Sequence, residues 1–198
     1  MGVDGTKRRS IGARRNPATE AAVVAAARDV LAEKGFVGFS VDEVARRAGA
    51  GKPTIYRWWP SRADLLLAVY AAERSARVAP PDTGSLAGDL AALARTLLAA
   101  WRNTPAGQAL RGLIAEAQGS EAALLALWDK FLPGWDAPIR AVLGEAARRG
   151  ETDPADVDLL AELCSGFLWR RLVTGQTDDD RAAIDRMARL LASGRGRK

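Results

Sequence analysis

The residues best suited to chemistry in this sequence lie in one short stretch, GKPTIYRWWPSRADLL, at residues 51–66. It places Tyr56, Trp58 and Trp59 among basic side chains in a chain with only 6% aromatic residues. Cations and hydroxyls hold phosphates, and small or polar side chains near a helix N-terminus can meet the edges of DNA bases. The stretch therefore indicates nucleic-acid binding.

The composition argues against an enzyme or a metalloprotein. The sequence has no histidine and a single cysteine, Cys164. This excludes Ser-His-Asp and Cys-His catalysis, the usual zinc spacings and an internal disulfide. We expect no catalytic residue, no metal and no cofactor, and we interpret Cys164 as a small buried residue.

Positive charge is concentrated in the N-terminal third. Residues 1–62 hold 12 basic and 6 acidic residues, a net charge of +6, whereas the remainder holds 17 and 18, a net charge of −1. A polyanionic partner is therefore expected for that third only. Residues 1–15 have the composition of a disordered basic arm, which would add contacts to DNA backbone or minor groove.

No signal peptide or membrane span is predicted. The N-terminal residues lack the apolar run of a signal peptide, and no later segment stays apolar for about 18 residues. We expect a cytoplasmic protein with no membrane contact.

An all-α fold is predicted to position the basic aromatic stretch. Alanine-rich segments with apolar residues three and four apart dominate, and alternating β-branched runs are almost absent. The N-terminal helices are expected over residues 17–34, 41–48, 52–58 and 61–78.

Helix start signals support these boundaries. Ser40 and Glu43 have capping-box spacing. In a capping box the serine oxygen accepts a hydrogen bond from the Glu43 amide, and the Glu43 carboxylate accepts one from the Ser40 amide. Pro53 suits only the first turn of a helix, and Ser61 with Asp64 three residues on opens the next one.

A linker at residues 79–84 contains two prolines and a glycine, which cannot continue a helix. We therefore divide the chain into an arm (1–15), a DNA-binding domain (16–78) and a second domain (79–198). Further helices are expected at about 85–102, 105–118, 120–149, 155–175 and 179–193, with Pro133-Gly134 as a candidate kink in the third.

Two short helices joined by a glycine turn and braced by a longer helix make a helix-turn-helix, whose second helix enters the major groove of DNA. Ile55 and Trp59 are four residues apart on one face of that helix, so we predict that they are buried. Tyr56 and Trp58 lie off that face, so we predict that both are available to DNA.

Residues 19–69 resemble the DNA-binding domain of the TetR family of transcriptional regulators. The stretch AARDVLAEKGFVGFSVDEVARRAGAGKPTIYRWWPSRADLL carries the resemblance, including the Ser40 cap and the Ala48-Gly49 turn. Two positions depart from the family pattern, since Trp58 replaces a usual histidine and Trp59 a usual phenylalanine.

The resemblance implies a homodimer that places one recognition helix per subunit into the major groove. It also implies roles for eight residues. The positions that meet base edges, or bases and adjacent backbone, are Lys52, Pro53 and Tyr56. The positions that face phosphates are Ser40, Thr54, Arg57, Trp58 and Arg62.

Residues 85–193 resemble, more weakly, the ligand-binding and dimerisation domain of one TetR subgroup, through PAGQALRGLIAEAQ, FLPGWDAPIRAVLGEAARRGE and CSGFLWRRLVTGQ. The family pairs its last two helices with those of the partner. Suitable apolar faces are formed by Leu159, Leu160, Leu163, Phe167 and Leu168, and by Ile184, Met187, Leu190 and Leu191, although the chain's own helices could equally cover them. Candidate residues for an apolar ligand pocket are Trp101, Trp128, Phe131, Trp135, Phe167 and Trp169.

We therefore predict a sequence-specific regulator, expected to be a repressor that a small-molecule effector releases from a near-palindromic double-stranded DNA operator. Half-sites about 34–36 Å apart, or a multiple of that, suit two-fold recognition helices. Two alternatives remain open: a transcriptional activator, and a nucleoid-type DNA-binding protein without an effector. An enzyme with an unrecognised helical site is disfavoured by the absence of histidine.

Overall fold

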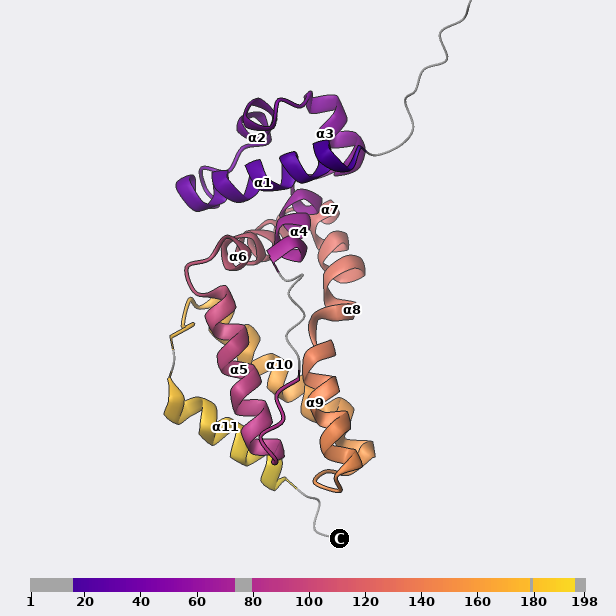
Figure 1. Cartoon of the computed structure of the whole chain (residues 1–198), viewed down its shortest axis with the longest axis vertical. Coiled ribbons are helices and arrows are strands. Elements are labelled where there is room, and N and C mark those ends of the chain that lie inside the picture. Colours follow the sequence, from indigo (N-terminus) through magenta and orange to yellow (C-terminus); the bar gives the residue numbers. More distant parts are fainter. Residues whose placement is uncertain (1–15, 74–79, 179, 195–198) are drawn as a thin grey trace, which may run out of the picture.

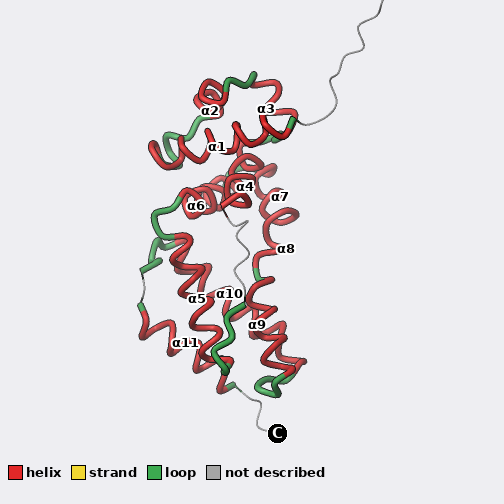
Figure 2. The backbone as a smooth tube through the Cα atoms, viewed as in Figure 1, coloured by secondary structure: helices red, strands yellow, loops and turns green. Residues whose placement is uncertain are grey.

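A computed structural model describes residues 16–73, 80–178 and 180–194, and within these ranges all regular structure is helical (Figure 2). This confirms the predicted all-α class. The predicted basic arm at 1–15 lies outside the described residues, and so do residues 74–79, where one of the predicted domain boundaries falls.

The N-terminal helices are α1 (Pro17–Lys34), α2 (Val41–Ala48), α3 (Lys52–Trp58) and α4 (Arg62–Glu73). The first three have the predicted boundaries because local signals set them. The Asn16 side chain accepts a hydrogen bond from the Ala18 amide at 3.1 Å, and Gly35, with φ of 65°, ends α1.

The N-caps of α2 and α4 differ in chemistry. At α4, Ser61 and Asp64 cap reciprocally: the Asp64 amide donates to Ser61 Oγ at 3.1 Å and the Ser61 amide donates to the Asp64 carboxylate at 3.0 Å. At α2 the predicted capping box is wrong. Ser40 Oγ accepts a hydrogen bond from the Asp42 amide at 3.2 Å, and the Glu43 carboxylate binds Arg46 and Arg47 in place of the Ser40 amide.

The C-terminal part begins with α5 (Leu86–Trp101), α6 (Pro105–Ala117) and α7 (Glu121–Ala126) and ends with α10 (Val157–Val173) and α11 (Arg181–Ser193). The single kinked helix predicted at 120–149 is instead divided into α7, a π-helical turn η1 (Leu127–Phe131), α8 (Leu132–Trp135) and α9 (Ala137–Arg148), and a 3₁₀ turn, η2 (Pro154–Asp156), precedes α10. Pro133 and Pro138 explain the division, since neither can donate an amide to a continuous helix.

The molecule is elongated, with α1–α3 at one end and α5, α9, α10 and α11 at the other (Figure 1). Helix α4 packs against both α1 and α6, and so belongs to the packing of both parts. The recognition region is therefore connected to the C-terminal helices mainly through α4.

A buried carboxylate, Asp89, fixes the start of α5 to the end of α9. It accepts a hydrogen bond from the Thr83 amide at 2.6 Å and pairs with Arg149 at 2.7 Å.

Candidate nucleic-acid interface

The turn between α2 and α3 has the conformation that a helix-turn-helix requires. Gly49 adopts the left-handed conformation (φ 61°, ψ 27°), which glycine reaches without a steric penalty. Gly51 is extended and caps α3, and Pro53 occupies its first turn, where the missing amide leaves no donor unsatisfied. These residues turn α3 sharply away from the direction of α2.

The predicted recognition helix presents most of its predicted contacts to solvent. Lys52, Pro53 and Arg57 are exposed, Tyr56 is 46% exposed and Thr54 is half-buried. Ser40 is also exposed, at the N-terminal end of α2. Arg62 is half-buried as well, so seven of the eight predicted DNA contacts lie at accessible or partly accessible positions, and Trp58 is the exception.

The structure corrects the predicted exposure of Trp58. Ile55 and Trp59 are buried as predicted, at 1% and 6% exposure, but Trp58 is buried as well, at 8%. The prediction of an available Trp58 is wrong because a residue three positions after Ile55 shares its face as closely as one four positions after it. The two indole rings pack edge to face, with 5.8 Å between their centroids.

Arg62 makes contacts within the chain, and its phosphate-facing role stays a prediction. Its guanidinium donates to the Phe36 backbone oxygen at 2.7 Å and lies 4.3 Å from the centre of the Phe36 ring. Its Nε lies 3.7 Å from Glu116 of α6. The side chain thus joins the loop before α2 to the C-terminal part, a role that no local pattern in the sequence indicates.

An acidic partner of Lys52 was not predicted from the sequence. Asp42 lies 2.5 Å from the Lys52 ammonium, and both side chains are more than half exposed. Their separation of ten residues crosses the turn, so helical spacing gives no signal of it. The pair brings the N-terminal ends of α2 and α3 together.

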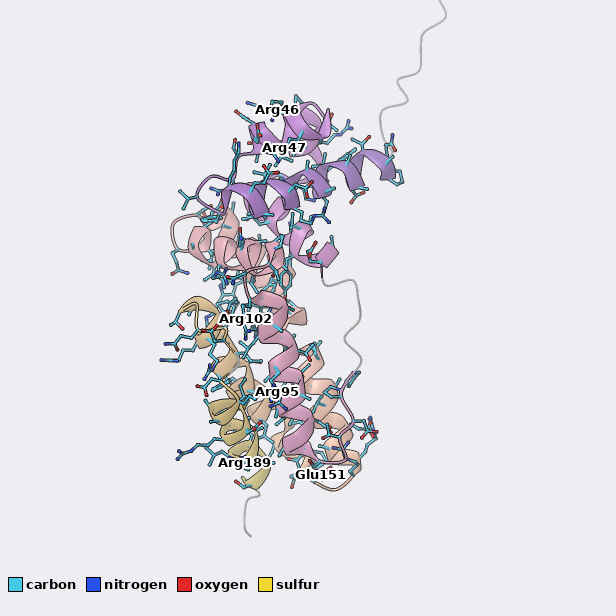
Figure 3. All side chains as sticks on the ribbon, turned by 60° about the vertical axis from the view of Figure 1, so that its left-hand side comes forward. Arg46, Arg47, Arg95, Arg102, Glu151 and Arg189 are labelled. Atoms are coloured by element: carbon cyan, nitrogen blue, oxygen red, sulfur yellow. The ribbon has the colours of Figure 1, made fainter. Side chains whose placement is uncertain are left out.

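Cations surround Glu43 on the same end of the molecule. Arg46 and Arg47 both bind its carboxylate, and these hydrogen bonds lower the pKa of Glu43. The spacings of three and four residues could have indicated these pairs. Figure 3 shows Arg46 and Arg47 at the end formed by α1–α3, far from Glu151 and Arg189.

The predicted ligand-pocket aromatics separate into three groups. Trp128, Trp135 and Trp169 line one pocket of about 440 Å³, the tryptophan pocket, between the α7–α8 region and α10. Phe131 lines a second pocket of about 560 Å³, the junction pocket, between α4 and η1. Trp101 and Phe167 line neither of these two. Trp101 is 2% exposed and stacks on Trp135, with 5.2 Å between ring centroids.

The junction pocket contains an ion pair between the two parts of the chain. Lys130 of η1 lies 2.5 Å from Asp64, the residue that caps α4. Burial raises the pKa of the Asp64 carboxyl, but hydrogen bonds from Lys130 and Ser61 outweigh it and lower the pKa below its usual value. Asp64 is therefore held as an anion between α4 and η1.

The last two helices leave apolar side chains uncovered. Leu160, Leu168 and Ile184 are buried within the chain, whereas Leu159 and Leu163 of α10 and Leu190 of α11 are between 52% and 62% exposed. Only part of each predicted apolar face is therefore covered by the chain's own helices.

Among the described residues, no group of three or more acidic or cysteine side chains is placed to hold a metal ion. In the same part of the chain, no helix has the length and apolar character needed to cross a membrane.

Two family profiles match the chain. Residues 23–69 match the profile described as bacterial regulatory proteins, tetR family. Residues 80–191 match the one described as tetracyclin repressor-like, C-terminal domain.

Relatives and solved structures agree with these matches. The HTH-type transcriptional regulator YdeS of Bacillus subtilis is 30% identical over 85% of this chain and 86% of its own. The DNA-binding transcriptional repressor TetR of Mycobacteroides abscessus is 34% identical over 84% and 88%. The crystal structure of the TetR family transcription regulator SCO0332 superposes with a TM-score of 0.73 at 29% identity, covering 89% of this chain and 97% of that one.

Proposed function

Because the chain belongs to the TetR family of transcriptional regulators, we propose that it is a homodimeric repressor that releases its operator when a small molecule binds the C-terminal part. Proteins of this family are DNA-binding regulators and not enzymes, and the helix-turn-helix is their DNA-binding part. The relative from Mycobacteroides abscessus is named as a repressor, which favours repression over activation.

The observation that carries the proposal is the exposure of basic and polar side chains along α3 beside a well-formed glycine turn. A helix of this kind reads bases with its N-terminal residues and holds phosphates with flanking cations and hydroxyls. The proposed base contacts are Lys52, Pro53 and Tyr56, and the proposed phosphate contacts are Ser40, Thr54 and Arg57.

Dimerisation is supported by the exposed leucines of α10 and α11. Leu159, Leu163 and Leu190 are each more than half exposed, and a hollow between the two helices lies among them. Burying apolar area of this kind gives roughly 25 cal/mol per Å², so a second copy packed on this face would gain free energy from it. Two recognition helices related by a two-fold axis then suit a palindromic operator.

Release requires that effector binding favours a conformation in which the recognition helices no longer fit the operator. Arg62 and Glu116 are suited to transmit such a change. Arg62 Nε and Glu116 Oε2 lie 3.7 Å apart, and both atoms are buried with no hydrogen-bond partner among the described residues. A small displacement of α6 would therefore change the environment of the residue that begins α4.

Beside Arg62 and Glu116, the Phe36 ring packs closely against Gly112 of α6. A β-carbon at Gly112 of α6 would lie 2.2 Å from Phe36 Cδ2, so only glycine admits the ring. The loop before α2 is thereby held directly on α6.

A second connection passes through η1. Trp128 of this turn lines the tryptophan pocket, while Lys130 pairs with Asp64 and Phe131 packs edge to face on Tyr70 of α4, with 5.3 Å between ring centroids. A ligand that moves Trp128 would thus move the partners of α4. π-helical turns are often found at functional sites, and this one lies between the pocket and α4.

The proposal is tested by competition binding. DNA flanking the protein's own gene is compared with random DNA of equal length at one salt concentration, because affinities without the salt concentration have no meaning. Preference for the flanking DNA, bound by two copies of the chain, is expected. Equal affinity for both DNAs would instead indicate a nucleoid-type protein and would overturn the proposal.

A further inference from the structure

The tryptophan pocket has an aromatic wall built from three helical segments. Trp128 comes from η1, Trp135 from α8 and Trp169 from α10. Trp135 and Trp169 pack edge to face with 5.4 Å between centroids, so their orientations are fixed, while Trp128 is 60% exposed and lies at the opening. Trp135 is 9% exposed and stacks on Trp101, so it forms the floor of the pocket, and a bulky apolar ligand would meet mainly the exposed ring of Trp128 and the half-buried ring of Trp169.

The polar groups of this pocket favour one sign of charge. Among the described residues that line it there is no lysine or arginine, and Glu162 is the one ionisable residue. Glu162 is exposed, and no hydrogen bond or ion pair occupies its carboxylate within the described residues. Ser165 adds a buried hydroxyl oxygen without a hydrogen-bond partner in the same residues.

These features match the requirements of a lipophilic cation. Tryptophan faces attract cations through the ring quadrupole, and the attraction grows when water is excluded. A carboxylate at the edge of the pocket adds Coulomb attraction for a cation and repels an anion. A buried hydroxyl without a partner can accept or donate a hydrogen bond to a polar atom of the ligand.

We propose that the effector of this protein is a lipophilic cation, that it binds in the tryptophan pocket against Trp128, Trp135 and Trp169, and that Glu162 selects its charge. The inference rests on the proposed function for its regulatory meaning, because it names the class of the effector. The binding site itself stands on the pocket's residues alone.

The test uses two ions of nearly the same shape and opposite charge, tetraphenylphosphonium and tetraphenylborate. Binding of each to the full-length protein is measured by isothermal titration calorimetry without DNA. Saturable binding of the phosphonium, at least about tenfold tighter than that of the borate, is expected. Equal affinities, tighter binding of the borate or no binding of the phosphonium would overturn the proposal.

Two variants locate the binding. Glu162→Gln is expected to weaken phosphonium binding about three- to tenfold, as expected for the loss of one partly solvated charge at contact distance. Trp128→Ala is expected to weaken binding of the phosphonium as well, with little effect on folding because the side chain is exposed. Glu73→Gln, which removes the same charge at the end of α4 and outside the pocket, is the control and should leave binding unchanged. Affinities that are insensitive to Glu162→Gln and Trp128→Ala would overturn the assignment.

Failure of this inference is distinguishable from failure of the proposed function. If the phosphonium binds in the expected pattern but operator affinity does not change, the site is retained and the release mechanism fails. If another ligand releases the operator while the phosphonium does not bind, the release mechanism is retained and the ligand class is wrong.

Discussion

Replacing Asp42 by asparagine is expected to strengthen operator binding. In the structure Asp42 Oδ1 forms an ion pair with Lys52 Nζ at 2.5 Å, and the two side chains are 66% and 52% exposed. An ion pair this exposed contributes about 0.2–1 kcal/mol. Lys52 must give up this interaction before it can contact a base, so the pair opposes DNA binding by that amount.

The expected gain is therefore at most about 1 kcal/mol, roughly a fivefold lower dissociation constant. The dependence of affinity on salt should also become steeper, by up to about one counterion, because the carboxylate no longer neutralises a cation at the interface. Fluorescence anisotropy of a labelled operator at several salt concentrations measures both quantities.

A matched control separates the local effect from net charge. Asp129→Asn removes the same charge on η1, in the C-terminal part of the molecule, and should change operator affinity less than Asp42→Asn. Asp42 also lies in the first turn of α2, where a negative charge stabilises the helix, so thermal unfolding of both variants is measured as well. If Asp42→Asn weakens operator binding while its melting temperature is unchanged, the carboxylate itself contacts DNA and our reasoning is refuted.

Three further predictions concern stability and reactivity. Trp59→Ala should lower the free energy of unfolding by about 3–5 kcal/mol in denaturant titrations because the indole is 6% exposed, and a wild-type melting curve would disprove the core role of Trp59. Gly112→Ala should cost about 1–3 kcal/mol by forcing its β-carbon against Phe36, whereas Gly144→Ala, where the described residues outside its own helix backbone leave open space, should stabilise α9 by up to about 1 kcal/mol; equal effects would contradict the tight contact. Burial raises the pKa of the Cys164 thiol to about 12, so a disulfide reagent at pH 8 should modify it no faster than the protein unfolds, and rapid modification of the native protein would be inconsistent with its burial.

Features set by neighbouring residues were predictable from the sequence. The boundaries of α1, α2 and α3 follow from Asn16, Ser40, the glycines and Pro53, all of which act within a few residues. The glycine turn and the exposure of Tyr56 follow in the same way. The family resemblance then supplied roles that spacing alone could not.

Features set by contacts between distant segments were not predictable. The pairing of Lys52 with Asp42 crosses a turn, and the position of Arg62 depends on Phe36 and on Glu116 of α6, 54 residues away. A helical wheel misplaced Trp58 because it compared only positions four apart in a helix of seven residues. The burial of Trp58 thus follows from local helix spacing, whereas the contacts of Arg62 come from long-range packing.

Selection of binding sites from a random-sequence DNA library most directly tests the central claim that α3 reads a specific operator. Enrichment of a near-palindromic sequence is expected, with half-sites separated by about one helical turn or a multiple of it. Lys52→Ala should relax the preference at one position in each half-site and cost roughly 1–3 kcal/mol. Recovery of unrelated sequences by the wild-type protein, or the same motif and affinity with Lys52→Ala, would contradict the account.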